Sequence, residues 1–499
     1  MKRLLRLLPI VILLCALRPP LLAAQGGTSF GPDLAQEGRD LSGCLHFSLT
    51  NINKCGTLFT GKPFHLSLGN LAPQNGIGIG LGFSEEQHPL FCPSSIDFVP
   101  APPPGTKNPC HWSLLYNADG QATTNGSWRI GAYLEASRIS SRAPHMTFPG
   151  KKPVKIPTFT RPSPVVDFYY QTTSLNRLYY YGLGPNTLPA GQSTFGLTES
   201  IVGISANVPL PKSPLDPLGI SIVGEASGRF PSLRGNHSSS SPSIETVYNE
   251  TTAPGFVSQP LFAQFGEGIR FIPTFPYNHF RLNYLLNFQQ FVTSGSPYGF
   301  RRLTIDLNHQ IPLYGTRTNK AINPPFAPSF GTTSSLPPAY VPVSPGGLPS
   351  VSKTKDFTSS ISFRLLLVES EAKAGSAVPF YFDPTIGGSD LNNNAMLPSY
   401  PDYRFRAPNL VLMRGSFEQA LGKLPIGLFF SVDAGKSALY RNDVDFSNLR
   451  KSYSAGLTVH AGGLPVAYLL FSWGGNEGNH FTGSVSNALL GASARPSLF

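Results

Sequence analysis

The segment Phe280–Gln289 reads FRLNYLLNFQ and alternates apolar with polar side chains. Leu285 is the one exception to an alternating set made of Phe280, Leu282, Tyr284, Leu286 and Phe288. The positions between them carry Arg281, Asn283, Asn287 and Gln289. Because successive side chains of a β-strand point to opposite faces, this period predicts a strand with one apolar face and one wet face. A half-buried strand of a soluble sandwich shows the same period, so the rest of the chain has to decide between the two.

The same alternation recurs along the chain. The clearest further examples are RLTIDLNHQI (302–311), FTSSISFRLL (357–366), SYSAGLTVH (452–460) and FTGSVSNAL (481–489). Repeated alternating segments of about ten residues, separated by turn residues, are typical of a transmembrane β-barrel. A soluble all-β chain of this length would need several domains joined by linkers. We therefore predict an all-β fold, a transmembrane antiparallel β-barrel.

Composition also favours a membrane protein. Only 13% of the residues are charged, whereas a soluble domain usually carries about 25%. Beyond the N-terminal leader no window approaches the roughly 18 apolar residues of a membrane-spanning helix. Since hydrocarbon offers no water to unpaired backbone groups, membrane-spanning strands must close into a barrel. In such a barrel the apolar residues of 280–289 face lipid and the polar residues face a wet lumen.

The chain begins MKRLLRLLPIVILLCALRPPLLAAQ, a basic start followed by an apolar run and small residues. This order is typical of a secretory signal peptide. We predict a signal peptide over residues 1–24, a short periplasmic segment over 25–62, the barrel over 63–490 and a C-terminal tail over 491–499. The predicted location is the bacterial outer membrane.

Four cysteines remain after the signal peptide, Cys44, Cys55, Cys92 and Cys110. An even number in an exported chain suggests disulfides, and more than one pairing is possible. The pairing with short loops joins Cys44 to Cys55 and Cys92 to Cys110. Zinc is the alternative, but the sequence has no C-x-x-C spacing.

The formal net charge is +11, but lysine and arginine are scattered and form no basic run, so we expect no nucleic-acid partner. Basic residues are instead expected to line a pore or to face anionic lipid head groups, which makes outer-membrane lipid the first expected partner. Two long polar connections, 229–255 and 314–350, are predicted to be external loops, because outer-membrane barrels combine short periplasmic turns with long external loops.

The C-terminal third contains an ordered set of motifs: GGSD at 387–390, DYRFR at 402–406, Glu418 on the next strand, and VDAGK at 432–436. FYYQTTSLNRLYYYGLGPNT (168–187) adds an aromatic strand followed by a Gly-x-Gly turn. Together these resemble the barrel of the bacterial surface antigen family, the superfamily of outer-membrane protein assembly factors and two-partner secretion transporters. The resemblance covers about residues 63–490, with its motifs concentrated beyond residue 380, and implies about 16 strands.

The resemblance also implies a long loop that folds into the lumen, where an arginine latches it to acidic residues on the inner wall. The residues that carry over are Gly387, Gly388 and Asp390 in the loop, and Glu418, Asp433 and Gly435 on the wall. The latch arginine does not carry over, because the chain reads LPSY at 397–400. Arg404 and Arg406 are the candidates to replace it, since a guanidinium can bind a carboxylate with two hydrogen bonds.

Residues 25–62 are too few for the polypeptide-transport-associated repeats with which this superfamily captures its clients. The leading expectation is a protein that assists insertion or translocation of polypeptides, with a weak seam between first and last strands and an inward loop around residues 387–406 as its working parts. Unfolded client polypeptides and separate periplasmic proteins are then the expected partners. The alternatives are a passive pore for small solutes and a structural surface protein. The chain lacks an H-E-x-x-H motif, and we expect neither an enzyme nor a cofactor.

Overall fold

The computed structural model of the chain describes residues 64–87, 112–138, 164–210, 219–236, 241–273, 280–319, 352–421, 426–461 and 464–485. The chain divides into two units, residues 1–65 and 66–499. Almost all of the described structure belongs to the second unit. The four predicted disulfide cysteines, the signal peptide, the segment 25–62 and the tail 491–499 lie outside the described residues, as do both predicted boundaries of the barrel.

The prediction of an all-β fold with about 16 strands is confirmed. A single antiparallel sheet has 16 strands whose order in the sheet follows their order in the chain. The strands are β1 (Phe64–Gly69), β2 (Gly78–Gln87), β3 (Trp112–Thr123), β4 (Trp128–Arg138), β5 (Val165–Tyr180), β6 (Ser193–Pro209), β7 (Ile220–Gly235), β8 (Phe262–Phe271), β9 (Arg281–Thr293), β10 (Phe300–Asn319), β11 (Ser352–Ala372), β14 (Asn409–Ala420), β15 (Ile426–Ala438), β16 (Arg450–Ala461), β17 (Leu464–Gly475) and β18 (Gly478–Val485).

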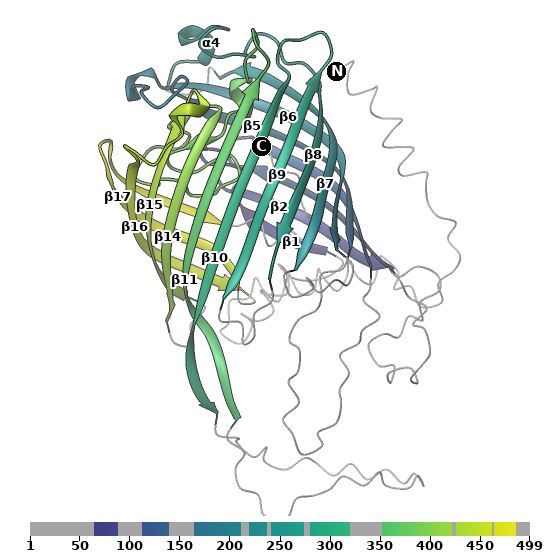
Figure 1. Cartoon of the computed structure of the whole chain (residues 1–499), viewed down its shortest axis with the longest axis vertical. Helices are drawn as coiled ribbons and strands as arrows, with labels where there is room; N and C mark the ends of the chain where they lie inside the picture. The colour runs from purple at the N-terminus through teal and green to yellow at the C-terminus, as the bar shows by residue number, and fades with distance from the viewer. Residues whose placement is uncertain are drawn as a thin grey trace, which may run out of the picture. The chain divides into compact units, whose positions relative to one another are not determined.

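The sheet curls into a barrel (Figure 1). A two-stranded sheet, β12 (Thr385–Ile386) with β13 (Phe405–Arg406), lies in the connection between β11 and β14. The helix α4 (Ile244–Val247) lies in the connection between β7 and β8. None of the helices within the described ranges is long and apolar enough to span a membrane.

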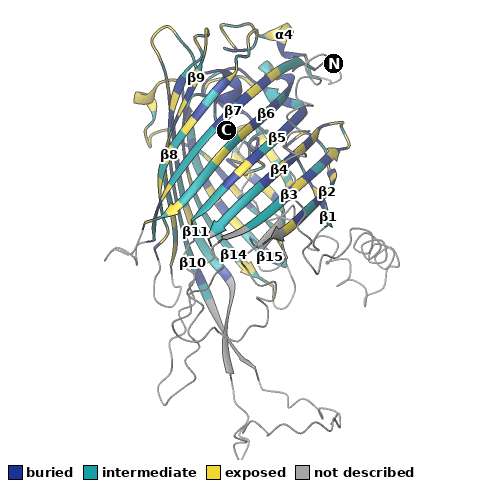
Figure 2. Cartoon of the chain, turned by 90° about the vertical axis from the view of Figure 1, so that its right-hand side faces the viewer, coloured by how far each residue is buried: buried dark blue, intermediate teal, exposed yellow. Residues whose placement is uncertain are grey.

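The ladder registers confirm the assignment of faces in the opening segment. Leu286 is paired with Ile305 and Phe288 with Leu303, so the apolar rows of β9 and β10 share one face. Side chains on that face are exposed: Leu286 is 46% exposed and Phe288 is 38% exposed. Gln289, on the opposite face, is only 9% exposed. Figure 2 shows this alternation of exposed and buried residues along the strands.

Aromatic residues stack on the same outer face near one end of β16 and β17. The ring of Trp473 lies 6.2 Å from that of Tyr453 and 5.9 Å from that of Phe471. All three are more than a third exposed. Aromatic residues form girdles where a bilayer meets water. An exposed face of this composition, wrapped around a barrel, identifies the chain as an outer-membrane type of β-barrel.

The inner face is less uniformly wet than the sequence predicted. Phe262, Phe291 and Phe300 follow the inward register of β8, β9 and β10, and none is more than 3% exposed. Leu366 and Leu410 are likewise buried on the inner side of β11 and β14. The reason is that a segment of the chain fills this end of the lumen and gives these side chains an apolar partner.

The expectation that the connections 229–255 and 314–350 are both external is wrong. Three antiparallel strands, β8, β9 and β10, separate the connection after β7 from the connection after β10, so the two leave from opposite ends of the barrel. Figure 1 shows α4 at one end and the extended tips of β10 and β11 at the other. The strands also continue into the expected loops, because β7 reaches Gly235 and β10 reaches Asn319.

Candidate functional site

The lumen segment, residues 373–408 between β11 and β14, is the structural feature that occupies the barrel interior. Its backbone contains a short 3-10 turn, Phe380–Phe382, and the β12–β13 pair. Gly387 and Gly388 follow β12 with φ of 112° and 64°, a left-handed conformation that glycine adopts without strain. A Cβ on Gly388 would lie against the backbone of Asp402, so this close approach also requires glycine.

An aromatic cluster anchors the first half of the lumen segment. Phe380, Tyr381 and Phe382 are at most 2% exposed. The ring of Phe382 lies 4.8 Å from Phe262 and 5.3 Å from Phe291, both on the inner wall. Burying a large apolar side chain contributes about 1.5 to 3 kcal/mol. The segment is therefore part of the hydrophobic core rather than a loosely placed loop.

Polar contacts connect the lumen segment to strands and turns around the barrel. The amide nitrogen of Phe380 donates to the carbonyl of Pro254, between β7 and β8. The side chain of Asn393 donates to the carbonyl of Asn70, after β1. The amide nitrogen of Ser399 donates to the hydroxyl of Ser452 on β16, over 2.9 Å. The segment thus bridges distant parts of the inner wall.

Asp433 on β15 is fully buried and pairs with Arg414 on the neighbouring strand β14. Arg414 Nε and its terminal nitrogen lie 2.6 and 2.7 Å from the two carboxylate oxygens. The same terminal nitrogen donates to the carbonyl of Ala395 in the lumen segment. The wall therefore supplies the arginine, and the lumen segment supplies only a carbonyl oxygen.

This geometry corrects the expectation that Arg404 or Arg406 binds Asp433. Arg404 donates to both carboxylate oxygens of Glu477, over 2.9 and 2.7 Å, in the connection between β17 and β18. It also donates to the hydroxyl and the carbonyl of Thr187, in the connection between β5 and β6. Its guanidinium lies over the rings of Tyr181 and Phe405. Arg404 is thus a latch, but to the rim of the barrel rather than to Asp433.

Arg406 is directed back into the lumen segment. One terminal nitrogen donates to the carbonyl of Phe380 over 2.8 Å, and its charge faces Asp383, a buried residue that sequence reasoning had not singled out. Arg404 and Arg406 flank Phe405 but have different partners: Arg404 binds Glu477 and Thr187, whereas Arg406 binds the carbonyl of Phe380.

The three other predicted residues have separate contacts. Asp390 closes a turn, accepting from the amide nitrogens of Asn392 and Asn394 over 2.9 and 2.7 Å. Gly435 on the wall contacts the lumen segment closely, since a Cβ there would collide with Ile386. Glu418 lies farther along the inner face of β14 and accepts a hydrogen bond from Thr458.

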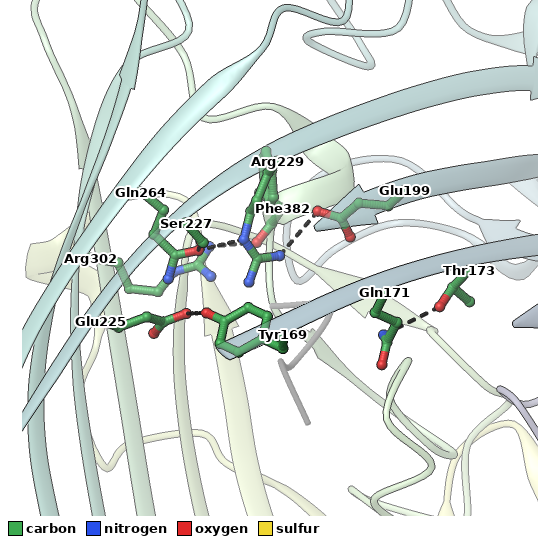
Figure 3. Close-up of polar contacts among 10 residues, drawn as sticks. All are labelled: Tyr169, Gln171, Thr173, Glu199, Glu225, Ser227, Arg229, Gln264, Arg302 and Phe382. Carbon is green, nitrogen blue, oxygen red and sulfur yellow. Dashed lines mark hydrogen bonds and ion pairs between the residues drawn. The ribbon is translucent and has the colours of Figure 1, made fainter. Parts of the chain in front are cut away.

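Sequence reasoning missed a second polar network on the inner wall, shown in Figure 3. Arg229 on β7 pairs with Glu199 on β6 over 3.0 Å. Arg229 also donates to Gln264 on β8, and its guanidinium lies 5.9 Å from the ring of Phe382. The sequence predicts a loop from residue 229 onward, whereas Arg229 lies on β7. Its inward register opposite Ile201 and Phe262 places it on the wall.

Comparison with known proteins gives structural likeness only. No protein-family model and no curated protein matches the chain. CdiB from Acinetobacter baumannii is similar in structure with a TM-score of 0.44 and 11% identity, over 84% of this chain and 58% of CdiB. BamA from Haemophilus ducreyi, in a crystal structure lacking POTRA domains 1–3, gives 0.42 and 10%, over 85% of this chain and 70% of that chain. The siderophore receptor PirA from Pseudomonas aeruginosa gives 0.25 and 12%, over 82% of this chain and 64% of PirA. The chain spans less than two thirds of the length of CdiB.

Proposed function

We propose that this protein assists the insertion or translocation of polypeptides at the bacterial outer membrane and acts through the barrel wall. The observation that supports this is the lumen segment. It is bound to the inner wall by an aromatic cluster, by the Arg404–Glu477 pair and by the contacts of Ser399 and Asn393. A client that passed through the lumen would have to displace all of them.

The free-energy cost of displacing the lumen segment favours a client route along the barrel wall over a route through the lumen. Exposing Phe380, Tyr381 and Phe382 to water would cost about 1.5 to 3 kcal/mol for each ring. Arg404, 1% exposed, would lose several charge-assisted hydrogen bonds, each contributing about 1.5 to 3 kcal/mol. β1 and β18 are the two end strands of the sheet, and the backbone groups along the edge of an end strand can pair with a client strand. We propose the seam between β1 and β18 as the place where a client strand pairs.

Reconstitution in liposomes with an unfolded client barrel tests the proposal. We expect the client to fold several times faster than in empty liposomes. A Ser399→Cys/Ser452→Cys variant, oxidised to fasten the lumen segment to β16, should keep this acceleration. No acceleration by the wild-type protein, or its loss on fastening the lumen segment, would contradict action through the wall.

A passive pore for small solutes is the second candidate, supported by the polar inner wall beyond the lumen segment. There Arg364 on β11 binds both carboxylate oxygens of Asp306 on β10, over 3.0 and 2.9 Å. Their side chains are 25% and 21% exposed, so water reaches them. Steady conductance of the wild-type protein in planar bilayers, unchanged when residues 387–400 are deleted, would favour the pore.

We propose outer-membrane lipid, unfolded polypeptides and separate periplasmic proteins as partners. We also propose that the chain is not an enzyme and needs no cofactor. Over the part of the chain that the structure describes, no group of three or more histidine, cysteine, aspartate or glutamate side chains is placed to hold a metal ion.

A further inference from the structure

A cavity of about 660 Å³ lies where the lumen segment enters and leaves the wall. We call it the rim cavity. Its lining includes Ala377 and Asp383 from the lumen segment, Arg302 and Leu303 from β10, and Tyr440 and Arg441 from the connection between β15 and β16. Binding sites for small molecules are usually about 300 to 1,000 Å³, with mainly apolar walls and a few convergent polar groups.

The rim cavity exists because β11 and β14 part near their ends. Their ladder ends at the pair Val368 and Leu410, but β11 continues to Ala372. The amide nitrogen of Ser370 instead donates to the side-chain oxygen of Asn409, over 3.1 Å. The wall is therefore open beyond this point, and the opening connects the outer side of the barrel with the lumen segment.

The floor of the rim cavity carries a carboxyl group without a hydrogen-bond partner among the described residues. Asp383 is 1% exposed, and neither of its carboxylate oxygens has a hydrogen-bond partner among the described residues. Burial raises the pKa of Asp383 well above its usual range, and the charges of Arg406 and Arg302 oppose this rise. A buried acceptor without a donor costs about 1 to 3 kcal/mol, and more when it is charged. A ligand that donates a hydrogen bond to Asp383 would recover that free energy.

The charged groups around Asp383 determine which kind of hydrogen-bond donor a ligand can bring to it. Arg302 and Arg406 are both cationic, so an ammonium group beside Asp383 would be repelled by two guanidinium groups. An anion has no hydrogen to donate to the unpartnered oxygens of Asp383. Hydroxyl groups, which donate to a carboxylate and accept from a guanidinium, satisfy both kinds of neighbour.

The mouth of the rim cavity adjoins the lipid-facing surface. Phe288 and Leu303, which belong to the apolar outer face, line the cavity. Arg441 and Glu369 form an ion pair over 2.8 Å beside it, and neutralise each other there. An uncharged head group attached to an apolar chain could enter with its chain still on the outer face.

We propose that the rim cavity binds a neutral polyhydroxylated group, a sugar ring, whose hydroxyls donate to Asp383. The sugar is either free or the head group of a membrane glycolipid. This inference does not depend on the proposed role in polypeptide insertion.

Saturation-transfer NMR on the full-length mature protein in lauryldimethylamine oxide micelles, a sugar-free detergent, tests the proposal. The probes are glucose, octyl glucoside, glucosamine and glucuronate. We expect transfer to the ring protons of glucose or octyl glucoside. Asp383→Leu should weaken the apparent Kd about tenfold, as the loss of one hydrogen bond implies. Asp445→Asn, a change of the same charge at an exposed loop, should leave the Kd unchanged.

Ala377→Trp provides a second variant, which fills the cavity and leaves Asp383 in place, and it should also abolish transfer. Binding of octyl glucoside alone would identify a lipid head group as the source, and equal binding of glucose would identify a free sugar. The proposal is overturned by no transfer to either sugar, by equal transfer in the Ala377→Trp variant, or by stronger binding of glucosamine or glucuronate than of glucose.

Discussion

At the scale of single residues, buried charges on the inner wall hold the lumen segment in place. Arg414 and Asp433 form a pair whose carboxylate is fully buried. Removing one partner of such a pair leaves an uncompensated charge, whereas replacing both partners with apolar residues is often nearly neutral. The two kinds of variant therefore separate the need for pairing from the need for these particular residues.

We predict that Arg414→Leu lowers the free energy of unfolding by about 3 to 5 kcal/mol, because Asp433 is left buried without its cation. The double variant Arg414→Leu/Asp433→Leu should lose much less. Denaturant unfolding in lipid vesicles measures both values. Lys436→Leu, which breaks the exposed pair with Asp445, is the control and should change stability little. Equal losses in the single and double variants would refute the pairing argument.

A second prediction concerns the pKa of Asp445, in the connection between β15 and β16. Hydrogen bonds from Lys436 and then Ser447 lower this pKa from 3.8 to about 2. The pKa of Asp445 is lower in the folded state than in the unfolded state. These hydrogen bonds therefore stabilise the folded state above pH 3.8, and this stabilisation is lost as the pH falls through about 2. A carboxyl titration by NMR should show the low midpoint, and Lys436→Met should move it back toward 3.8. A midpoint that does not respond to this change would contradict the assignment.

At the scale of elements, successive side chains of each strand point alternately to the lipid and to the lumen. A shift of one residue in register would exchange the two faces. The pairing of Leu286 with Ile305 and of Asn287 with Thr304 shows how the two faces stay in phase between neighbours. The same alternation explains why Arg229, Arg302 and Arg414 all point inward.

We predict that Leu286→Arg lowers the stability of the barrel by about 2 to 4 kcal/mol, the cost of a cation on the lipid face near mid-bilayer. The neighbouring change Asn287→Arg places the same charge in the lumen and should be tolerated, as should Asn283→Arg beside a damaging Leu282→Arg. Folding yield in vesicles is the measurement. Equal yields for Leu286→Arg and Asn287→Arg would show that the faces are misassigned.

At the scale of the whole molecule, the lumen segment turns a hollow barrel into one with a core. Its aromatic cluster joins β6, β8, β9 and β10 to residues 380–382. This core lies at the end of the barrel that carries α4 (Figure 1). The other end keeps a polar inner wall that water can enter.

We predict that Phe380→Ser/Phe382→Ser releases the lumen segment, because truncating one buried aromatic side chain costs about 3 to 5 kcal/mol. Protease should then cut within 387–400 while the strands remain intact, and the wild-type segment should resist. Phe446→Ser, at a loop position 64% exposed, is the matched control. Resistance in the double variant would mean that Arg404 and the other polar contacts are sufficient to hold the segment.

The sequence determined the strands, their two faces and the class of fold, because a period of two is a local property that needs no knowledge of the partner strand. The family resemblance of its motifs implied that Gly387, Gly388, Asp433 and Gly435 belong to one inward arrangement. Only the tertiary structure decided which arginine meets which carboxylate, since Arg414 and Asp433 meet through a ladder register and Arg404 of the lumen segment meets Glu477 of the connection between β17 and β18. It also decided that Phe291 and Phe300 face inward to a core and that Asp383 lies beside a cavity. Such contacts join residues far apart in the chain, and no local pattern encodes the distance between them.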